Sequence, residues 1–564
     1  MLMMRAATSA LALALLSGAA PTAVWAAPNT AQFSNFVYSG SDPSDAVKAA
    51  PDQYRNPILQ GFYPDPSVTR VGKDYYLVNS TFAWFPGLPV HHSTDLVHWE
   101  QIGNALDRPG MLDFKRLGLS RAVFAPAITH HDGLFYILNT CVDCGGNFLI
   151  TAKDPKGPWS DPVWLPEVGG IDASLFFDDD GRAWIVNNDN PPGPAEYQGH
   201  RAIWIQEYDP KTQKTIGPRS VLLDKGVDPS TKPIWPEGPH ILKKDGWYYL
   251  VAAEGGTAEG HSQVVLRSKA ATGPYVPYKD NPILTQRGLP KDRPLPITSA
   301  GHADIVDAPD GSWWATFLAV RPYGDDTYNT GRETFLLPVE WKDGWPVILP
   351  NGQTIPYVKT APKLPALKVR PTSGPFRVAE TFAGPELPKG WMTMRIPTSR
   401  WWSVKGGLLN VEARAARIGD NDQPSVWARR QQHMNATVST TVRFTPKADG
   451  DKAGLVAVQN DDFYWFVGLV RDGGKTLVRV EKRAGKGDPV DGVVVAEKPV
   501  SLVNGQGLNL KIVARGGALD FAYGTTPGQW ETLKADADGT TLSTKVAGGF
   551  VGTMLGVYAH GAGQ

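Results

Sequence analysis

The chain has 564 residues, which exceeds the length of one ordinary domain and predicts two. Lys plus Arg equal Asp plus Glu, so the formal net charge is zero, and neither nucleic acid nor an anionic membrane surface is expected as a partner. The 19 Trp, 59 Gly and 48 Pro residues favour many short strands joined by tight turns, with aromatic rings available for ligand contacts.

Residues 1–26 have the features of a signal peptide. Arg5 supplies the positive charge, residues 9–20 form a short apolar core, and Val24 and Ala26 lie where a signal peptidase cuts. The apolar run is shorter than the ~20 residues that span a bilayer, and a retained membrane anchor is the alternative. The pattern predicts an exported protein, either periplasmic or secreted, with no membrane partner.

A glycine turn followed by aromatic residues in a short β-prone run occurs five times in the first two thirds of the chain. Such a turn between alternating apolar residues is a hairpin signal. Five similar units, roughly 50–65 residues apart, predict an all-β fold with a five-bladed β-propeller over residues 50–354. A β-sandwich with repetitive turns is the alternative. The five glycines are Gly72, Gly133, Gly181, Gly246 and Gly311.

Two cysteines, Cys141 and Cys144, lie three positions apart within the second unit. An oxidising compartment favours a local disulfide, and two free thiols are the alternative. The flanking residues lack the βαβ context of a redox motif, and a single CxxC pair is not enough for a structural zinc site.

Residues 355–375 contain five prolines and predict a stiff, extended linker that does not join a sheet interior. Beyond it, residues 436–444 (ATVSTTVRF) alternate strictly, with Ala436, Val438, Val442 and Phe444 on one face. Residues 407–413 and 453–470 look similar. This pattern predicts a second all-β domain, a β-sandwich over residues 376–564.

Three acidic residues stand in apolar, turn-rich settings rather than on solvated faces. Asp65 lies between two prolines that fix its backbone. Asp172 lies in an apolar run, where an unpaired carboxylate is costly. Glu237 lies between Trp-Pro and Gly-Pro, a setting that raises a carboxyl pKa, as a general acid requires. Since glycosidic bond hydrolysis needs two carboxyl groups, these three are candidate catalytic residues.

The segments around these residues resemble glycoside hydrolase family 43, whose members are five-bladed propellers. The resemblance runs through residues 56–346 and includes NPILQGFYPDPSV, GIDASLFFDDDGRAW, EGPHILKKDGWYYL and TSAGHADIV. It is greatest for the β-xylosidases and α-L-arabinofuranosidases that carry a C-terminal concanavalin-like sandwich. It implies an inverting mechanism with Asp65 as general base, Glu237 as general acid, and Asp172 tuning the pKa of the acid.

The resemblance also assigns binding residues. His302 and Arg332 would face the sugar or its neighbouring water, Phe82 would form part of the pocket wall, and Thr257 would lie near the site. Phe124 stands where relatives commonly have a tryptophan; it can stack on a sugar but lacks an indole N–H. No cofactor is required, although a hydrated Ca²⁺ near His302, held through water, is a further implication because Ca²⁺ takes oxygen ligands.

The expected substrate is a xylo-oligosaccharide or an arabinoxylan fragment, from which the enzyme would release terminal xylose from β-1,4-linked chains, with or without α-L-arabinofuranosidase activity. The alternatives are an arabinofuranosidase acting on arabinoxylan side chains or arabinan, an endo-acting arabinanase, and a non-catalytic glycan-binding propeller. The sequence does not decide whether the enzyme prefers xylosides or arabinosides, and it does not decide the oligomeric state. The sandwich is expected to pack on the propeller and lend a loop to the site.

Relatives usually continue past the segment GGFVGTMLGVYAHG with a further strand, whereas this chain stops at Gln564. We therefore expect either a sandwich without its last strand or a truncated sequence. An unpaired strand edge would be an aggregation risk.

Overall fold

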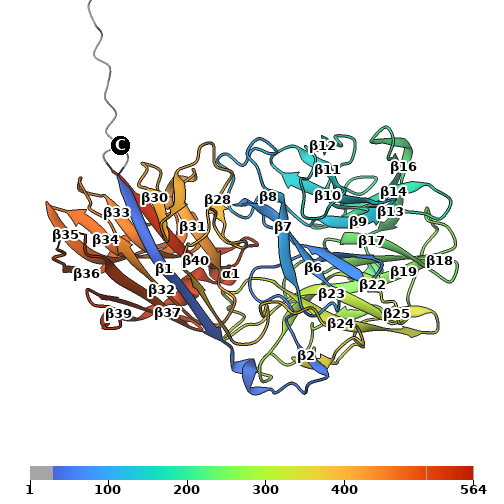
Figure 1. Ribbon diagram of the computed structural model, residues 1–564. Helices are drawn as coiled ribbons and strands as arrows, with labels where there is room; N and C mark the ends of the chain where they lie inside the picture. The colour runs from blue at the N-terminus through green and yellow to red at the C-terminus, as the bar shows by residue number, and fades with distance from the viewer. Residues whose placement is uncertain (1–28, 504, 563–564) are drawn as a thin grey trace, which may run out of the picture.

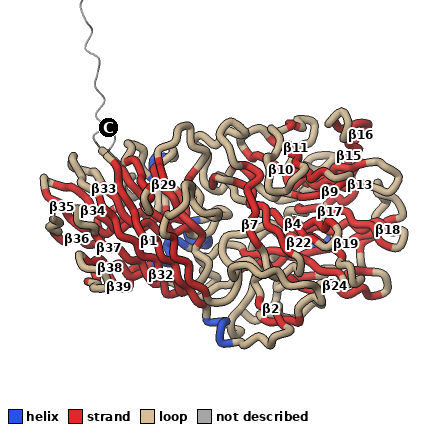
Figure 2. Tube along the Cα trace, viewed as in Figure 1, coloured by secondary structure: helices blue, strands red, loops and turns tan. Residues whose placement is uncertain are grey.

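The computed structural model describes residues 29–503 and 505–562, so the predicted signal peptide lies outside the described residues. Two β-rich units lie side by side (Figure 1), and strands dominate both (Figure 2). None of the helices in these ranges is long and apolar enough to cross a bilayer. The helices are short turns: η1 (Pro43–Ala46), η2 (Pro229–Thr231), η3 (Ile418–Asp420), η4 (Gly539–Leu542) and α1 (Thr544–Ala547).

The first unit contains five antiparallel sheets that follow one another along the chain. The first is β3 (Ser67–Val71), β4 (Asp74–Val78), β6 (Gly87–Ser93) and β7 (Glu100–Leu106). The second is β8 (Ala122–Val123), β9 (Ala127–His131), β10 (Leu134–Val142), β11 (Gly146–Ala152) and β12 (Val163–Trp164). The third is β13 (Ile171–Phe177), β14 (Ala183–Asp189), β15 (Ala202–Asp209) and β16 (Lys214–Asp224).

The fourth and fifth sheets complete this unit. The fourth is β17 (Glu237–Lys244), β18 (Trp247–Glu254), β19 (Ser262–Ser268), β20 (Val276–Pro277) and β21 (Leu284–Thr285). The fifth is β22 (Thr298–Asp307), β23 (Trp313–Val320), β24 (Glu333–Lys342) and β25 (Trp345–Val347). The strands β3, β9, β13, β17 and β22 pack against one another in that order, and β22 returns to β3, so they form a closed ring.

The five predicted glycine turns occupy equivalent places in the five sheets. Each joins the strand of the ring to its hairpin partner, from Gly72 between β3 and β4 to Gly311 between β22 and β23. All five glycines have a positive φ, between 63° and 85°, which glycine adopts without steric penalty. The repeated pattern therefore marked the first hairpin of every sheet.

The second unit is a pair of facing sheets around its own core. One sheet runs β29 (Trp402–Lys405), β30 (Leu408–Glu412), β1 (Thr30–Ser41), β32 (Asn435–Arg443), β37 (Leu508–Arg515), β38 (Ala518–Gly524) and β39 (Glu531–Asp538), with β27 (Phe376–Glu380) on β1. The other runs β31 (Ser425–Arg430), β40 (Met554–His560), β33 (Lys452–Asn460), β34 (Phe463–Asp472), β35 (Lys475–Ala484) and β36 (Val493–Pro499).

Alternation predicted the sandwich strands correctly where it was strict. In β32, Ala436, Val438 and Val442 face the core and are buried. The last strand, β40, is paired on both sides, by β31 and β33, so it does not form the exposed edge that the sequence suggested. Cys141 and Cys144 form a disulfide, the first of the two alternatives considered for them.

The N-terminal segment was not expected in the sandwich. Strand β1 lies between β30 and β32, and in Figure 1 it is the blue strand among the orange and red ones. The proline-rich segment is also less isolated than a free linker, because β26 (Val358–Thr360) pairs with β2 (Gln53–Arg55) at the rim of the first unit. A second short ladder joins the units themselves, where β5 (Trp84–Phe85) pairs with β28 (Thr393–Met394).

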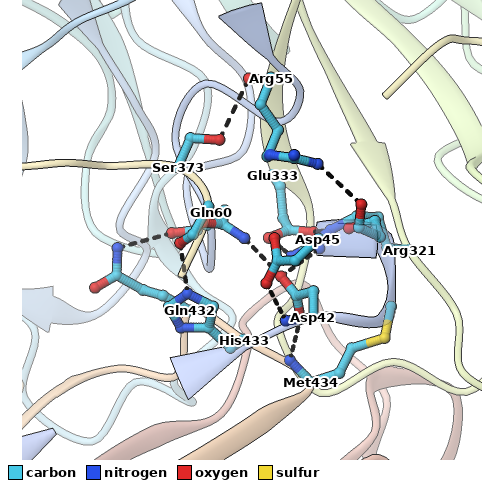
Figure 3. Close-up of polar contacts among 12 residues, drawn as sticks. Asp42, Asp45, Arg55, Gln60, Arg321, Glu333, Ser373, Gln432, His433 and Met434 are labelled. Atoms are coloured by element: carbon cyan, nitrogen blue, oxygen red, sulfur yellow. Dashed lines mark hydrogen bonds and ion pairs between the residues drawn. The ribbon is translucent and has the colours of Figure 1, made fainter. Parts of the chain in front are cut away.

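A fully buried ion cluster fixes the junction of the two units. Arg321, directly after β23, contacts Asp42 at 2.6 Å and Glu333 at 2.6 Å, and all three side chains have no exposed area. Asp42 also accepts hydrogen bonds from the backbone N–H of Met434 at 2.7 Å and from the Gln60 amide at 2.6 Å. Figure 3 shows these groups converging. The cluster ties the segment after β1 to both units.

Candidate active site

A pocket of about 460 Å³ opens where the ring strands begin. All eight residues singled out in the sequence line it: Asp65, Phe82, Phe124, Asp172, Glu237, Thr257, His302 and Arg332. They come from all five sheets or from the segments next to them. Asp65 and Arg332 are the furthest apart in the sequence, with a separation of 267 residues. The ring therefore brings residues far apart in the sequence to one place.

Asp65 is buried in the turn before β3, with an exposed fraction of 4%. Its Oδ1 accepts a hydrogen bond from Arg332 Nη1 at 2.9 Å, and its Oδ2 accepts one from Ser80 Oγ at 2.5 Å. Burial alone would raise the pKa of Asp65, but the charge of Arg332 and the Ser80 hydrogen bond help to outweigh it, and the pKa is lowered. Asp65 is therefore ionised at neutral pH, as a base must be.

Asp172 and Glu237 lie at the starts of neighbouring ring strands. Asp172 Oδ2 accepts a hydrogen bond at 3.1 Å from the backbone N–H of Gly238, the residue next to Glu237. Burial first, then the charge of Asp65, raises the pKa of Asp172 to about 7. Burial first, then the charge of Asp172, raises the pKa of Glu237 well above 4.5. The two carboxyls titrate as a pair that holds a proton at neutral pH.

Irregular backbone aims these side chains into the pocket. Strands β13, β17 and β22 each shift register near their first residues, at the points that carry Asp172, Glu237 and His302. Such bulges redirect side chains and are common next to active sites. Asp65, Asp172 and His302 all adopt a left-handed φ between 51° and 57°, which is rare outside glycine and tends to be retained at functional sites.

His302 is a packed, neutral histidine beside the base. Its Nδ1 lies 3.9 Å from Asp65 Oδ1, and burial lowers its pKa to about 4. The ring lies against Gly238, where a Cβ would approach Nε2 to 2.8 Å, so this position requires glycine. The His302 imidazole thus lies between the strand that carries Glu237 and the turn that carries Asp65.

Within the described residues, His302 is not part of a cluster of side-chain ligands for a directly bound Ca²⁺. Ca²⁺ takes about six to eight oxygen ligands. Within residues 29–503 and 505–562, no group of three or more His, Cys, Asp or Glu side chains is arranged to hold a metal ion. The ion held through water near His302 that the resemblance implies stays a prediction, and no catalytic step is derived from it.

Aromatic rings form one wall of the pocket. Phe82 contacts Phe124 edge-to-face at 5.1 Å between ring centroids. Phe550 stacks on Phe82 at 5.7 Å and meets Phe124 at the same distance. The Arg332 guanidinium lies 5.4 Å from the Phe550 ring centroid and donates a hydrogen bond to Thr257 at 3.1 Å. Aromatic rings in a pocket that also holds carboxylates offer a surface on which a sugar ring can stack.

Phe550 comes from the second unit, as expected of a loop lent to the site. Its loop lies between α1 and β40, and its backbone N–H donates to Ser120 Oγ at 2.9 Å. Gly552 in the same loop packs against Gly331, where an added Cβ would lie 3.0 Å from the Gly552 Cα. Gly331 directly precedes Arg332, so the second unit supports the residue that contacts Asp65.

Two functional side chains, Ser80 and Phe550, were not predicted. Phe550 lies in the segment GGFVGTMLGVYAHG noted in the sequence, and Ser80 lies two residues before Phe82, but neither residue type stands out there. Trp235, two residues before Glu237, also lines the pocket. Trp235 stands between two prolines and close to Glu237, and this setting could have identified it.

Two family descriptions match consecutive parts of the chain. Residues 54–346 match glycosyl hydrolases family 43, and residues 379–564 match the beta xylosidase C-terminal concanavalin A-like domain. The chain belongs to glycoside hydrolase family 43. It is therefore a glycoside hydrolase, and its pocket of three carboxylates is the candidate active site of a family 43 enzyme.

Relatives match over nearly the full length. A xylosidase/arabinosidase of Butyrivibrio fibrisolvens is 38% identical over 516 residues, 90% of this chain and 96% of that protein. The non-reducing end alpha-L-arabinofuranosidase BoGH43B of Bacteroides ovatus is 36% identical, over 92% of this chain and 93% of that protein. The crystal structure of a GH43_12 protein retrieved from a capybara gut metagenome matches with a TM-score of 0.88 at 39% identity. The match covers 94% of this chain and 99% of that one.

Proposed function

We propose that this family 43 enzyme releases terminal xylose from β-1,4-xylo-oligosaccharides with inversion, and that it also accepts α-L-arabinofuranosides. The observation that carries the chemistry is the opposite protonation of two carboxyls in one pocket. The pKa of Asp65 is lowered and that of Glu237 is raised. An ionised carboxylate can act as the base, and a protonated carboxyl can act as the acid. The names of the full-length relatives support pentose substrates.

The proposed reaction is a single displacement. Asp65 removes a proton from a water molecule as the water oxygen bonds to the anomeric carbon. The bond from that carbon to the glycosidic oxygen breaks, and Glu237 gives its proton to the departing oxygen. Asp172 raises the pKa of Glu237 and holds the adjacent Gly238 backbone N–H. Since water must fit between base and sugar, the carboxyls of Asp65 and Glu237 should lie about 6.5–9.5 Å apart.

The position of Phe550 favours attack on chain ends. The phenyl ring of Phe550 closes one side of the pocket. A pocket closed on one side accepts a terminal sugar more readily than the middle of a chain. The second candidate function is an α-L-arabinofuranosidase acting on arabinoxylan side chains or arabinan, which the name of the Bacteroides ovatus relative favours. A non-catalytic glycan-binding protein is disfavoured, because all three carboxylates converge.

The test uses matched substrates and the anomer first formed. The ratio of kcat/KM for p-nitrophenyl β-xyloside and α-L-arabinofuranoside, repeated on xylobiose and an arabino-oligosaccharide, decides between the two sugars. Proton NMR of the fresh product decides the stereochemistry. A β-xyloside should yield α-xylose first. Appearance of β-xylose before mutarotation would indicate retention, and a role for Asp65 as base would then be wrong.

Asp172→Asn is expected to move the alkaline limb of the pH profile to lower pH. The charge of Asp172 raises the pKa of Glu237, so removing that charge lets the acid lose its proton earlier as pH rises. The neutral amide can still accept from Gly238. We expect kcat to fall about 100-fold at the optimum. The measurement is kcat/KM against pH. An alkaline limb that stays in place would contradict the coupling of Asp172 and Glu237.

Phe550→Ala should weaken substrate use without changing the pH profile. Loss of the partly buried Phe550 ring from the pocket wall removes about 1.5–3 kcal/mol of substrate binding free energy, or roughly a 10- to 150-fold decrease in kcat/KM on xylobiose. Trp530→Ala, in the same unit but 38% exposed and outside the pocket, is the matched control and should leave kcat/KM unchanged. Equal effects of the two substitutions would show that Phe550 acts only through the stability of its unit.

We also propose that turnover needs no bound metal, since the donors near His302 do not form a direct site. Exhaustive dialysis against a chelator should leave kcat/KM unchanged. A loss of activity that Ca²⁺ restores and Mg²⁺ does not would instead support an ion held through water near His302.

Two structural expectations complete the proposal. The closed ring of five sheets supports a propeller of five blades, as does the equivalent place of the five glycine turns. The signal-peptide features of residues 1–26 support export to the periplasm or the medium. Mass spectrometry of the N-terminus of exported protein tests the second expectation, and a mature chain that begins at Met1 would contradict it.

A further inference from the structure

A second cavity lies between the two units, away from the active site. Its volume is about 460 Å³, and it shares no lining residue with the active-site pocket. Its walls come from the first sheet, from the proline-rich segment and from the second unit. Tyr63 and Trp99 belong to the first unit, whereas Trp391 belongs to the second. The cavity is therefore a feature of the assembled chain rather than of either unit alone.

The lining of this cavity is strongly cationic. Five positive side chains line it, against only two carboxylates, those of Glu100 and Glu380, which leaves a net charge of +3. Among the described residues, none of the five cations forms an ion pair with a carboxylate. The five cations are Lys368, Arg370, Lys389, Arg429 and Arg430.

Arg430 is the decisive residue because it is 2% exposed and lacks a carboxylate partner. Its Nε donates to the Phe62 carbonyl, and its guanidinium lies 4.1 Å from the Tyr63 ring centroid, but its Nη2 is buried without a hydrogen-bond partner. Other buried arginines behave differently: Arg321 and Arg395 each contact a carboxylate. A buried cation without a counter-charge is destabilising unless something compensates it.

Further donors in the lining also lack acceptors. Arg429 Nε and Trp391 Nε1 are buried without a hydrogen-bond partner. Burial is the main cause that lowers the pKa of Arg429 and Arg430, and the charge of Glu380 offsets it only in part at Arg429. Burial, assisted by the charge of Arg430, lowers the pKa of the neighbouring His91 to about 3, so His91 is neutral and does not add to the positive charge. The cavity thus offers donors and positive charge but few acceptors.

We propose that this cavity binds a small oxyanion, either the carboxylate of a sugar acid or inorganic phosphate. Guanidinium groups match carboxylate and phosphate oxygens in geometry and charge, and they do so best where water is excluded. An oxyanion there would accept hydrogen bonds from Arg430 and Arg429 and would neutralise part of the excess positive charge. Lys389 and Arg370, exposed at the mouth, would attract the anion from solution.

The experiment measures the thermal midpoint of the full chain with sodium phosphate, sodium glucuronate, or sodium chloride at equal ionic strength. Neutral glucose is the control for glucuronate, from which it differs by the carboxylate. Binding should raise Tm by roughly 2 °C at tenfold the dissociation constant and should saturate. A response to phosphate alone identifies an inorganic anion site, and a response to glucuronate but not glucose identifies a sugar acid site. Equal shifts with chloride would overturn the proposal.

Substitutions then locate the effect. Arg430→Met should abolish the saturable rise in Tm. If that variant does not fold, Lys389→Met and Arg370→Met at the mouth should each raise the apparent dissociation constant at least about threefold, while kcat/KM on xylobiose stays unchanged. Lys475→Met, an exposed lysine on β35 outside the cavity, should leave binding unchanged. A rise in Tm that persists in Arg430→Met, or that falls equally in Lys475→Met, would overturn the assignment.

Discussion

Asp65→Ala is expected to abolish turnover of every substrate, with kcat reduced by about 10³- to 10⁴-fold, because attack on the anomeric carbon requires a base. The substitution also leaves the buried Arg332 without its carboxylate, whose Oδ1 lies 2.9 Å from Arg332 Nη1. Asp65→Asn is therefore the better variant for kinetics, because the amide keeps the volume, its oxygen can still accept from Arg332, and its N–H can donate to the Ser80 hydroxyl. Calorimetry should show that Asp65→Asn retains its fold.

Glu237→Ala provides the contrast that separates base from acid. Aryl glycosides with good leaving groups need little protonation, so this variant should retain much of its activity on them and lose about 100-fold or more on xylobiose. Asp65→Asn should lose activity on both kinds of substrate. Rates would be measured on a series of aryl xylosides whose leaving-group pKa varies. A loss in Glu237→Ala that does not depend on the leaving group would contradict its role as general acid.

Local chemistry in the sequence predicted the carboxylates. Prolines around Asp65 and the Trp-Pro and Gly-Pro pairs around Glu237 restrict the backbone within a few residues, so the signal lies in the segment itself. The glycine turns were predictable for the same reason, because a positive φ at a hairpin tip favours glycine wherever the rest of the chain lies. The family resemblance added the roles of residues that local chemistry did not distinguish.

The parts that were not predicted depend on contacts between distant segments. Strand β1 pairs with β32 about 400 residues later, and nothing in residues 30–41 indicates which sheet they join. Ser80 and Phe550 become functional only because the ring and the second unit bring them to Asp65 and Phe82. The arginines of the second cavity are ordinary in the sequence, and they are unusual only because, among the described residues, no carboxylate forms an ion pair with them.

Arg321→Met is expected to destabilise the chain by about 3–5 kcal/mol, because it leaves the buried carboxylates of Asp42 and Glu333 without a counter-charge. Glu333 also accepts a hydrogen bond from the Gly61 backbone N–H at 2.7 Å, and it directly follows Arg332. Loss of the cation should therefore loosen both the segment that leads to Asp65 and the residue that holds it. We expect Tm to fall by roughly 4–7 °C and kcat/KM to fall with it.

The matched control is Arg400→Met, which removes an arginine from an exposed pair with Glu386 in the second unit. Exposed ion pairs contribute about 0–1 kcal/mol, so Tm should barely change. The double variant Arg321→Met/Glu333→Gln removes one of the two stranded charges and should recover part of the lost stability. Calorimetry of the three variants measures these shifts. A fall in Tm for Arg321→Met no larger than for Arg400→Met would show that the junction does not depend on its buried ions, and that the apolar contacts between the two units hold it alone.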